Sequence, residues 1–369
     1  MVMYGDVFRG RSVWLSGHTG FKGAWLAEWL LGLGATVHGY ALTPPTEPSL
    51  FDQLGLAARM DHQIGDVRDR EAVAASIQAA QPDFVFHLAA QPLVRLSYMQ
   101  PVETYATNVM GTVHVLEALR TLEKPCVAVI VTTDKCYENR EWVYGYREED
   151  PMGGHDPYSS SKGMVELATS AYRRSFFAGG PVRVASARAG NVVGGGDWAL
   201  DRIVPDCVRA LQYGQPIAVR NPRATRPWQH VLEPLSGYLW LAACLAREGD
   251  DRGAALAGAF NFGPTAAANR NVGELVQEIL RHWPGTWEDR SEPDAVHEAN
   301  LLQLSIDKAQ SYLRWSPVWD FPATVRYTMA WYRDARMYKQ SANFKRLTQD
   351  QIRQYSDAAR SVGAAWTKN

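Results

Sequence analysis

The sequence predicts an α/β fold, in which helices cover a doubly wound parallel sheet and a smaller mixed α/β lobe binds the substrate. Short apolar runs alternate with helical patterns through the first half of the chain, as in sheets built from strand–helix–strand units. A glycine-rich turn joins the first run to the first helix. Polar residues follow the fifth run directly, at the edge where such sheets bind ligands.

The predicted strands and helices alternate in a regular order from the N-terminus. Residues 13–16 form the first strand, and the following helix carries apolar residues at helical spacing, among them Trp25, Trp29 and Leu33. Further strands are expected at residues 36–40, 61–65, 83–88, 127–131 and 182–188, and helices at residues 70–80, 104–122 and 158–177. This alternation is typical of a Rossmann-type doubly wound sheet.

Beyond residue 190 the alternation loosens into a loop at 194–198, a helix at 203–213 and a short strand at 216–220. We therefore expect two domains followed by an extension. The predicted ranges are 1–192 and 230–262 for the Rossmann domain, 193–229 and 263–335 for the substrate-binding lobe, and 336–369 for the extension. The extension is rich in Gln, Lys, Arg and Ser, and we expect an added helix or a partly mobile tail.

Composition excludes several classes of protein. A net charge of −1 over 369 residues and a pI near 6.8 favour no binding to nucleic acid or to an anionic membrane. The four cysteines lack metal-type spacing and the nine histidines are scattered, so no metal site is expected. The N-terminus resembles neither a signal peptide nor a membrane span, so we expect a cytoplasmic protein.

The glycine-rich turn predicts a nucleotide-binding site. Glycines let the backbone approach a pyrophosphate, which lies against the amides at the N-terminus of the next helix. The expected contacts come from Gly17, Thr19, Gly20, Phe21, Lys22 and Gly23. The second strand ends without an acidic residue for a ribose hydroxyl or an arginine for a 2′-phosphate, so these residues leave NAD or NADP open.

Tyr158 and Lys162 form a Tyr-x-x-x-Lys pair well downstream of the glycine-rich turn. Residues four apart share one face of a helix, so the lysine cation can lower the pKa of the phenol. Such a phenol is an acid or base for alcohol–ketone chemistry. The glycine-rich turn and this pair together predict a nucleotide-dependent redox site.

Several longer segments carry a more specific resemblance. They are the turn at 17–23, His-Leu-Ala-Ala-Gln-Pro-Leu-Val-Arg-Leu-Ser at 87–97, Thr-Thr-Asp-Lys-Cys-Tyr-Glu-Asn at 132–139, Arg-Ala-Gly-Asn-Val-Val-Gly-Gly-Gly-Asp-Trp at 188–198 and Arg-Pro-Trp-Gln-His at 226–230. Together they resemble the extended short-chain dehydrogenase/reductases, and within them the nucleotide-sugar 4,6-dehydratases. The resemblance favours NAD and a sugar-nucleotide substrate, and implies a hydro-lyase that makes deoxysugars for surface polysaccharides such as the lipopolysaccharide O-antigen.

The resemblance also implies roles for five residues. Tyr158, assisted by Thr133 and Lys162, would take the proton from the 4-hydroxyl of the sugar. Asp134 would protonate the departing 6-hydroxyl, and Lys135 would remove the C5 proton. The dTDP-glucose enzymes carry glutamate where this chain has Lys135. A lysine base must be neutral, with a pKa well below its usual value of about 10.4. Lys135 is therefore either the C5 base or a charged group that stabilises the enolate.

The remaining expected contacts divide between cofactor and substrate. For the cofactor they are Asp66, Val67, Leu88, Ala89, Ala90 and Asn108, besides the turn, Tyr158 and Lys162. For the substrate they are Gln91, Ser97, Asn191, Arg202, Arg220 and Arg226. Guanidinium groups bind phosphate in bidentate fashion, so the three arginines are candidates for the diphosphate.

Three alternatives stay open. The sugar nucleotide that the resemblance favours is CDP-glucose. The chain could instead act on another sugar nucleotide, such as dTDP-glucose or GDP-mannose, or it could be a 4-epimerase. An epimerase needs no acid and base at C5 and C6, so Asp134 and Lys135 argue against it. A dinucleotide-binding regulator without catalysis is the non-enzyme alternative, which intact Tyr158 and Lys162 disfavour. We also expect a homodimer or a dimer of dimers, joined through the helices at 104–122 and 158–177.

Overall fold

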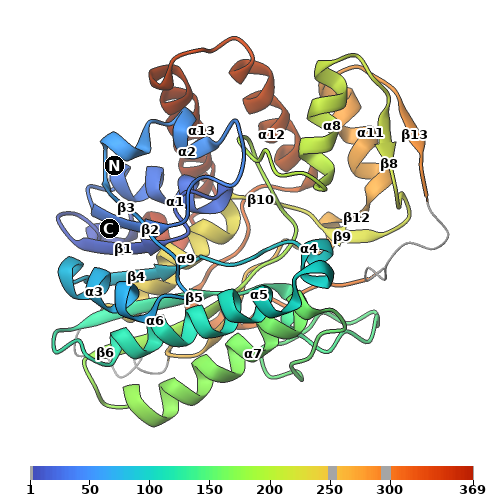
Figure 1. Cartoon of the computed structure of the whole chain (residues 1–369). Coiled ribbons are helices and arrows are strands. Elements are labelled where there is room, and N and C mark those ends of the chain that lie inside the picture. The colour runs from blue at the N-terminus through green and yellow to red at the C-terminus, as the bar shows by residue number, and fades with distance from the viewer. Residues whose placement is uncertain (1–2, 248–255, 292–300, 369) are drawn as a thin grey trace.

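The computed structural model describes residues 3–247, 256–291 and 301–368 (Figure 1). Residues 248–255 of the predicted Rossmann domain and residues 292–300 of the predicted substrate lobe lie outside the described residues. Within the described residues, no helix is long and apolar enough to span a membrane.

A seven-stranded sheet, parallel throughout the described part of the chain, forms the centre of the molecule, with strand order β11-β6-β5-β4-β1-β2-β3. The strands are β1 (Ser12–Ser16), β2 (Thr36–Ala41), β3 (Asp61–Ile64), β4 (Phe84–His87), β5 (Cys126–Val131), β6 (Val182–Arg188) and β11 (Ala259–Asn261). The order reverses between β1 and β4, which is where doubly wound sheets bind ligands at the carboxyl ends of their strands. The predicted α/β class is confirmed.

Helices cover both faces of the sheet, and alternate side chains of one strand enter different apolar cores. Val13 and Leu15 of β1 belong to the larger core, whereas Trp14 belongs to a separate one. The helices α1 (Phe21–Gly32) and α9 (Leu232–Leu245) contribute to the larger core. The opposite face is covered by α3 (Arg70–Ala80), α6 (Gly111–Leu119) and α7 (Pro157–Tyr172) (Figure 1).

The two longest predicted helices of the sheet domain are interrupted by π-helical turns. The helix predicted at 104–122 comprises α5 (Pro101–Tyr105), the π-helical turn η3 (Ala106–Met110) and α6. The helix predicted at 158–177 continues from α7 into the π-helical turn η5 (Arg173–Phe177). Single π turns are common at functional sites, and Asn108 lies within η3. Asp156 caps the start of α7 by accepting a hydrogen bond from the amide of Ser159.

A group of smaller elements lies at one end of the sheet (Figure 1). Three two-stranded sheets pair β7 (Val192–Val193) with β10 (Gln229–His230), β8 (Ile217–Val219) with β13 (Trp287–Asp289), and β9 (Thr225–Pro227) with β12 (Asn269–Asn271). The helices here are α8 (Ile203–Gln212), α11 (Val272–His282) and α12 (Phe321–Ala335). The division into domains stays a prediction.

The described residues also form several short helices. They are η1 (Tyr4–Asp6), α2 (Leu50–Gln53), η2 (Leu56–Ala58), α4 (Val94–Met99), η4 (Asp134–Cys136), η6 (Ala266–Ala268), η7 (Ala309–Leu313) and η8 (Ala365–Thr367).

The C-terminal extension contains the helix α13 (Ser341–Ser361), which packs against α1. After it, Trp366 is fully buried between the rings of Tyr4 and Tyr355, at centroid distances of 5.2 and 5.8 Å. The C-terminus therefore completes the core beneath the first helix of the sheet domain.

Candidate active site

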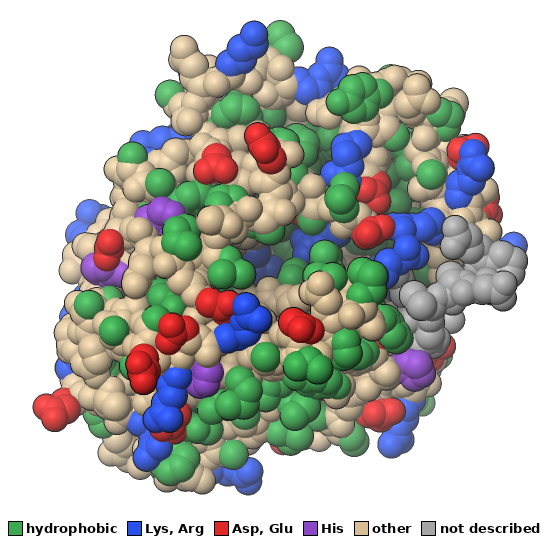
Figure 2. Space-filling model, viewed as in Figure 1, with side chains coloured by type: hydrophobic (Ala, Val, Ile, Leu, Met, Phe, Trp, Pro, Cys, Tyr) green, Lys and Arg blue, Asp and Glu red, His purple; other side chains and the backbone are tan. Residues whose placement is uncertain are grey.

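A cleft of about 1800 Å³ opens at the carboxyl ends of the central strands. Figure 2 shows this hollow near the middle of the visible face, with Lys and Arg side chains inside it. Its walls combine the glycine-rich turn, the segments after β4 and β5, the start of α7, the loop after β6, and residues near α8 and β9. Most of the predicted site residues line this cleft.

The glycine-rich turn packs so tightly that two of its glycines have no room for a side chain. Gly17 has a φ of +74°, and a Cβ there would lie 2.7 Å from the backbone nitrogen of Ala89. A Cβ at Gly23 would overlap the carbonyl of Gly17. Gly20 precedes α1 without a side-chain cap, so the first amides of α1 remain for another acceptor. This arrangement fits a dinucleotide phosphate.

Ser16 at the end of β1 holds the loop after β4 against the turn. Its hydroxyl accepts hydrogen bonds of 3.1 Å from the amides of Leu88 and Ala89, and contacts His87 Nδ1 at 2.7 Å. Leu88, Ala89 and Ala90, the predicted cofactor contacts, therefore line the cleft beside the turn.

Asn108 and Ser97 are predicted contacts that do not line the cleft. Asn108 is buried and clamps the backbone of Gln91, accepting from its amide at 2.8 Å and donating to its carbonyl at 3.2 Å. Ser97 is buried and accepts a 3.1 Å hydrogen bond from the amide of Tyr158. Both residues instead fix the backbone of neighbours that line the cleft.

Tyr158 and Lys162 project from α7 and are both almost completely buried. Burial raises the pKa of Tyr158 to about 12, while a hydrogen bond to Thr133 and the charge of Arg202 act against this rise. Burial lowers the pKa of Lys162 to about 8, and the negative charge of Glu166 opposes that fall. The tyrosine is therefore a strong base once it loses its proton, and the lysine titrates close to neutral pH.

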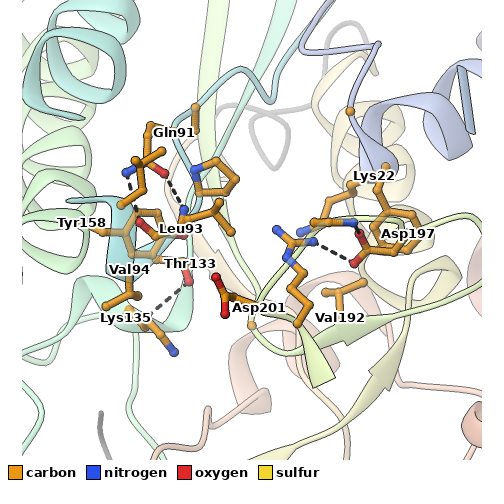
Figure 3. Close-up of a pocket in the computed structure, with 18 of the residues that line it drawn as sticks. Lys22, Gln91, Leu93, Val94, Thr133, Lys135, Tyr158, Val192, Asp197 and Asp201 are labelled. Atoms are coloured by element: carbon orange, nitrogen blue, oxygen red, sulfur yellow. Dashed lines mark hydrogen bonds and ion pairs between the residues drawn. The ribbon is translucent and has the colours of Figure 1, made fainter. Parts of the chain in front are cut away.

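Asp134 and Lys135 lie in η4, directly after β5. The hydroxyl of Thr133 donates to Asp134 Oδ1 at 2.9 Å, and Asn191 Nδ2 donates to Asp134 Oδ2 at 3.3 Å. A Cβ at Gly190 would overlap the Asp134 carboxylate, so the backbone after β6 also holds this side chain. Figure 3 shows Thr133, Lys135 and Tyr158 on the same side of the cleft.

Lys22 enters the cleft from the opposite side, beside Asp197 (Figure 3). Burial lowers its pKa to about 7, as do the charges of Arg202 and Lys162, while Asp134 acts in the other direction. Its Nζ lies 5.8 Å from the ring centroid of Tyr238. Tyr238 is buried, and its hydroxyl finds no hydrogen-bond partner among the described residues.

The arginines predicted to bind the diphosphate are already engaged with other groups. Arg202 pairs with Asp197 at 2.9 Å and Arg220 pairs with Asp201 at 2.7 Å. Arg226 is buried and donates to the carbonyl of Thr225 at 2.9 Å. All three line the cleft. The predictions missed these aspartates, although Asp197 lies in the conspicuous Gly-Gly-Gly-Asp-Trp segment.

Asp66 and Val67 also line the cleft. Its carboxylate accepts from the guanidinium and the amide of Arg68. Nearby, the ring of His18 fills the space against Gly39 at the end of β2, where a Cβ would lie 2.6 Å from His18 Nδ1. Burial and the neighbouring His62 lower the pKa of His18 to about 4, so the ring is neutral. Within the described residues, no cluster of His, Cys, Asp or Glu could hold a metal ion.

Several known proteins resemble this chain in sequence. The sequence profile described as GDP-mannose 4,6 dehydratase matches residues 15–328. A CDP-glucose 4,6-dehydratase of Salmonella typhimurium is 48% identical over 337 residues, which cover 89% of this chain and 92% of the relative. A dTDP-glucose 4,6-dehydratase of Streptomyces antibioticus is 30% identical over 288 residues, which cover 74% of this chain and 76% of that protein.

Solved structures with the same fold are more distant in sequence. The dTDP-glucose 4,6-dehydratase of Bacillus anthracis in complex with NAD gives a TM-score of 0.72 at 19% identity, covering 90% of this chain and 99% of that one. The UDP-glucose 4-epimerase of Thermotoga maritima gives 0.74 at 20% identity, covering 88% and 99%. These likenesses support the fold, and the profile and the relatives identify the chain as a member of the GDP-mannose 4,6-dehydratase family.

Proposed function

We propose that this protein is a CDP-glucose 4,6-dehydratase, a hydro-lyase that converts CDP-D-glucose to CDP-4-keto-6-deoxy-D-glucose and water. The observation that carries this proposal is the arrangement of an acid/base pair, Asp134 and Lys135, beside Tyr158 and Thr133 in one cleft. An oxidation site and an elimination site therefore share one substrate position. The choice of CDP-glucose rests on the relative that is 48% identical over most of the chain.

The cofactor of this reaction is NAD. The turn from Gly17 to Gly23 would hold its phosphates, and Asp66, Val67 and the segment 88–90 would surround its adenosine and nicotinamide ends. Bound NAD would supply a hydride acceptor for C4 and a hydride donor for C6, so that no external oxidant is consumed. Lys162, one turn after Tyr158, would contact the nicotinamide ribose.

Tyr158 takes the proton from the 4-hydroxyl as C4 is oxidised. The hydrogen bond to Thr133 and the positive charge of Arg202 favour the phenolate, against the effect of burial. The sequence predicted that Lys162 lowers the pKa of this phenol, whereas burial raises it and Lys162 is not among the groups that oppose the rise. The phenolate form is the base that takes this proton, and the phenol so formed is the acid that later returns it.

Elimination follows, because a ketone at C4 acidifies the proton at C5. Lys135 removes that proton or stabilises the enolate that forms, and Asp134 protonates the departing 6-hydroxyl. The C5–H and C6–O bonds break, a C5–C6 double bond forms, and water leaves. Reduction at C6 and return of a proton to C5 complete the product. The hydrogen bonds from Thr133 and Asn191 fix the orientation of the Asp134 carboxyl group.

The sugar nucleotide would occupy the part of the cleft lined by Gln91, Asn191 and the three arginines. Arg202 and Arg220 would share their ion pairs with Asp197 and Asp201 when a diphosphate binds. A planar guanidinium carries several donors, so it can hold a phosphate and a carboxylate together.

A second copy of the chain would cover the outer surface of the helices α5 to α7. This surface exposes large apolar side chains that a single subunit leaves in water. They are Val102, Met110, Met164, Leu167 and Phe176, with exposed fractions of 72%, 47%, 45%, 61% and 50%. We propose a homodimer through this face, with a dimer of dimers as the larger form.

The four cysteines are free and buried, which suits a reducing cytoplasm.

The test is a comparison of substrates at equal concentration with added NAD. Purified protein is incubated with CDP-glucose, dTDP-glucose, GDP-mannose or UDP-glucose, and 4-keto-6-deoxy sugar is measured by its absorbance in alkali. CDP-glucose should give the highest rate. A higher rate with another sugar nucleotide would make that compound the substrate. Formation of a C4 epimer without keto sugar would identify an epimerase instead.

A further inference from the structure

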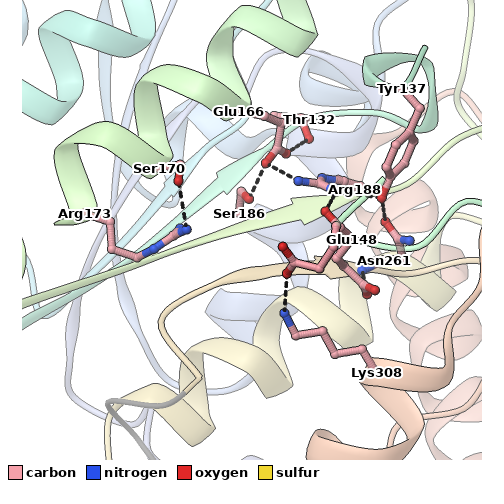
Figure 4. A network of polar contacts seen from close by, with 11 residues as sticks. Thr132, Tyr137, Glu148, Glu166, Ser170, Arg173, Ser186, Arg188, Asn261 and Lys308 are labelled. Carbon is pink, nitrogen blue, oxygen red and sulfur yellow. Dashed lines mark hydrogen bonds and ion pairs between the residues drawn. The ribbon is translucent and has the colours of Figure 1, made fainter. Parts of the chain in front are cut away.

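Glu166 lies one helical turn after Lys162 on α7 and is buried beneath the catalytic residues. Its carboxylate receives three hydrogen bonds (Figure 4). Thr132 donates to Oε1, and Ser186 and Arg188 donate to Oε2 at 2.7 and 2.8 Å. Burial alone would raise the pKa of Glu166, but the charge of Arg188 and these hydrogen bonds lower it below its usual value. The carboxylate is therefore ionised and fully engaged.

Arg188, the partner of Glu166, extends the network to Tyr137, which follows Asp134 and Lys135 in the chain. Its Nη1 donates to the hydroxyl of Tyr137 at 2.6 Å and to the carbonyl of Glu148 at 2.9 Å. The hydroxyl of Tyr137 in turn donates to Asn261 at 2.7 Å, on β11. Six buried side chains thus connect α7, β6, β11 and the segment after β5 (Figure 4).

The network holds both ends of the segment that carries Asp134 and Lys135. Thr132 precedes this catalytic pair and Tyr137 follows it, and each hydrogen-bonds to one member of the Glu166–Arg188 ion pair. Glu166 itself belongs to the helix that carries Tyr158 and Lys162. One ion pair therefore connects the oxidation residues to the elimination residues.

The packing at Gly163 brings α7 so close to the catalytic segment that the two cannot approach further. A Cβ at Gly163 of α7 would lie 2.8 Å from the carbonyl of Gly153 and 3.2 Å from that of Cys136. A buried ion pair adds little net stability, because removing two charges from water offsets most of their attraction. Its location at the junction of the catalytic elements points to a geometric role.

We propose that Glu166, paired with Arg188, is a positioning residue that fixes the segment 132–137 relative to the helix bearing Tyr158 and Lys162. Thr132 is the link through which Glu166 acts on Asp134 and Lys135. Ser186 hydrogen-bonds to the same carboxylate, but it lies within β6 and outside the segment 132–137. This inference rests on the proposed function, since it assigns a purpose to the shared geometry of the two sites.

The chain offers a matched pair of variants for the test. Thr132→Val and Ser186→Ala each remove one buried hydroxyl that donates to Glu166, so both should lower the melting temperature similarly. Only Thr132→Val should lower kcat, by about 10- to 100-fold with KM unchanged, since a small misplacement of reacting groups costs rates of that order. Thr132→Ser, which keeps the hydroxyl, should restore kcat. Tyr137→Phe, which releases the other end, should act in the same direction.

Amide hydrogen exchange in the ligand-free protein provides a readout that needs no activity. Exchange of the peptide covering residues 132–137 should rise in Thr132→Val and stay unchanged in Ser186→Ala. Equal effects of both variants on kcat and exchange, or no effect of either, would overturn the positioning role. Wild-type protein that forms keto sugar from none of the sugar nucleotides would overturn the proposed function, while the exchange comparison would still decide this inference.

Discussion

Thr133 is hydrogen-bonded both to Asp134, at 2.9 Å, and to Tyr158. One hydroxyl therefore touches the residue proposed to act at O4 and the residue proposed to act at O6. Oxidation at C4 must precede loss of the C5 proton, because only the ketone makes that proton acidic. A shared hydroxyl keeps the two groups in a fixed relation while the substrate passes from one step to the next without leaving.

Removing the hydroxyl of Tyr158 should abolish most of the turnover. Tyr158→Phe keeps the ring in its buried place but has no group to take the 4-hydroxyl proton. We expect kcat to fall by roughly 10²- to 10⁴-fold, the usual contribution of a positioned acid or base. Calorimetric titration should find sugar-nucleotide binding unchanged. Turnover close to that of the wild type would remove Tyr158 from the mechanism.

The cofactor should be held loosely. The end of β2 provides neither a carboxylate for the ribose hydroxyl nor an arginine for a 2′-phosphate, and His18 packs against Gly39 at this place. Purified protein should therefore carry less than one NAD per chain, and added NAD should raise its activity. Full occupancy after extensive dialysis would contradict this, and higher activity with NADP would change the cofactor assignment.

Lys22 should make stability depend on pH in a defined direction. Its pKa in the folded protein is about 7, mainly because of burial, whereas an unfolded lysine has a pKa of about 10.4. Between these values the unfolded chain binds a proton that the folded chain does not, so this contribution to stability rises with pH. Lys22→Met should therefore stabilise the cofactor-free protein more at about pH 6 than at about pH 9. Urea unfolding at both pH values measures the difference, and an equal gain would contradict it.

Much of the sheet was predictable, because each strand carries a local signal. The predicted strand at 182–188 coincides with β6. The predicted strand at 127–131 lies within β5, where a fully buried apolar run leaves little choice. The interruption of the helix at 104–122 was not predictable from periodicity, because a π turn adds one residue without changing the apolar character. Asn108 within it was a signal of an unusual helix.

The positions of cleft residues were predictable from the sequence only for residues that lie next to the end of a strand. Thr133 and Asp134 directly follow β5, so their place at the edge of the sheet could be inferred. The ion pair of Arg202 with Asp197 depends on how a loop folds back, which has no periodic signal. The role of Ser97 in holding the amide of Tyr158 joins residues 61 positions apart, and only the tertiary structure brings them together.

The C-terminal extension should be essential for stability. Trp366 is fully buried and contacts Tyr4 and Tyr355, so Trp366→Ala would leave a large cavity. We expect a loss of about 3–5 kcal/mol in the free energy of unfolding. Tyr312→Ala, at a side chain that is 63% exposed, is the control and should change it by less than about 0.5 kcal/mol. Similar losses in both variants, measured by urea unfolding, would contradict the packing role of Trp366.

Substitutions at Asp134 and Lys135 should separate oxidation from elimination. Asp134→Asn keeps size and hydrogen bonding but cannot donate a carboxyl proton, and Lys135→Met keeps the stem but loses the amine. Neither change touches Tyr158, so both variants should still oxidise C4, seen as reduced nicotinamide absorbance after mixing with CDP-glucose and NAD. Both should release little 4-keto-6-deoxy sugar, because the proton transfers at C5 and O6 are lost.

Solvent deuterium exchange at C5 distinguishes the two roles left open for Lys135. If its amine is the base, Lys135→Met should abolish exchange, because no other group removes the proton. If its ammonium only stabilises the enolate, exchange should slow but continue, since the base is then another residue. Asp134→Asn should exchange C5 in either case, because its defect lies at the departing hydroxyl. Full product formation by both variants, beside a slow Tyr158→Phe control, would assign elimination to other residues.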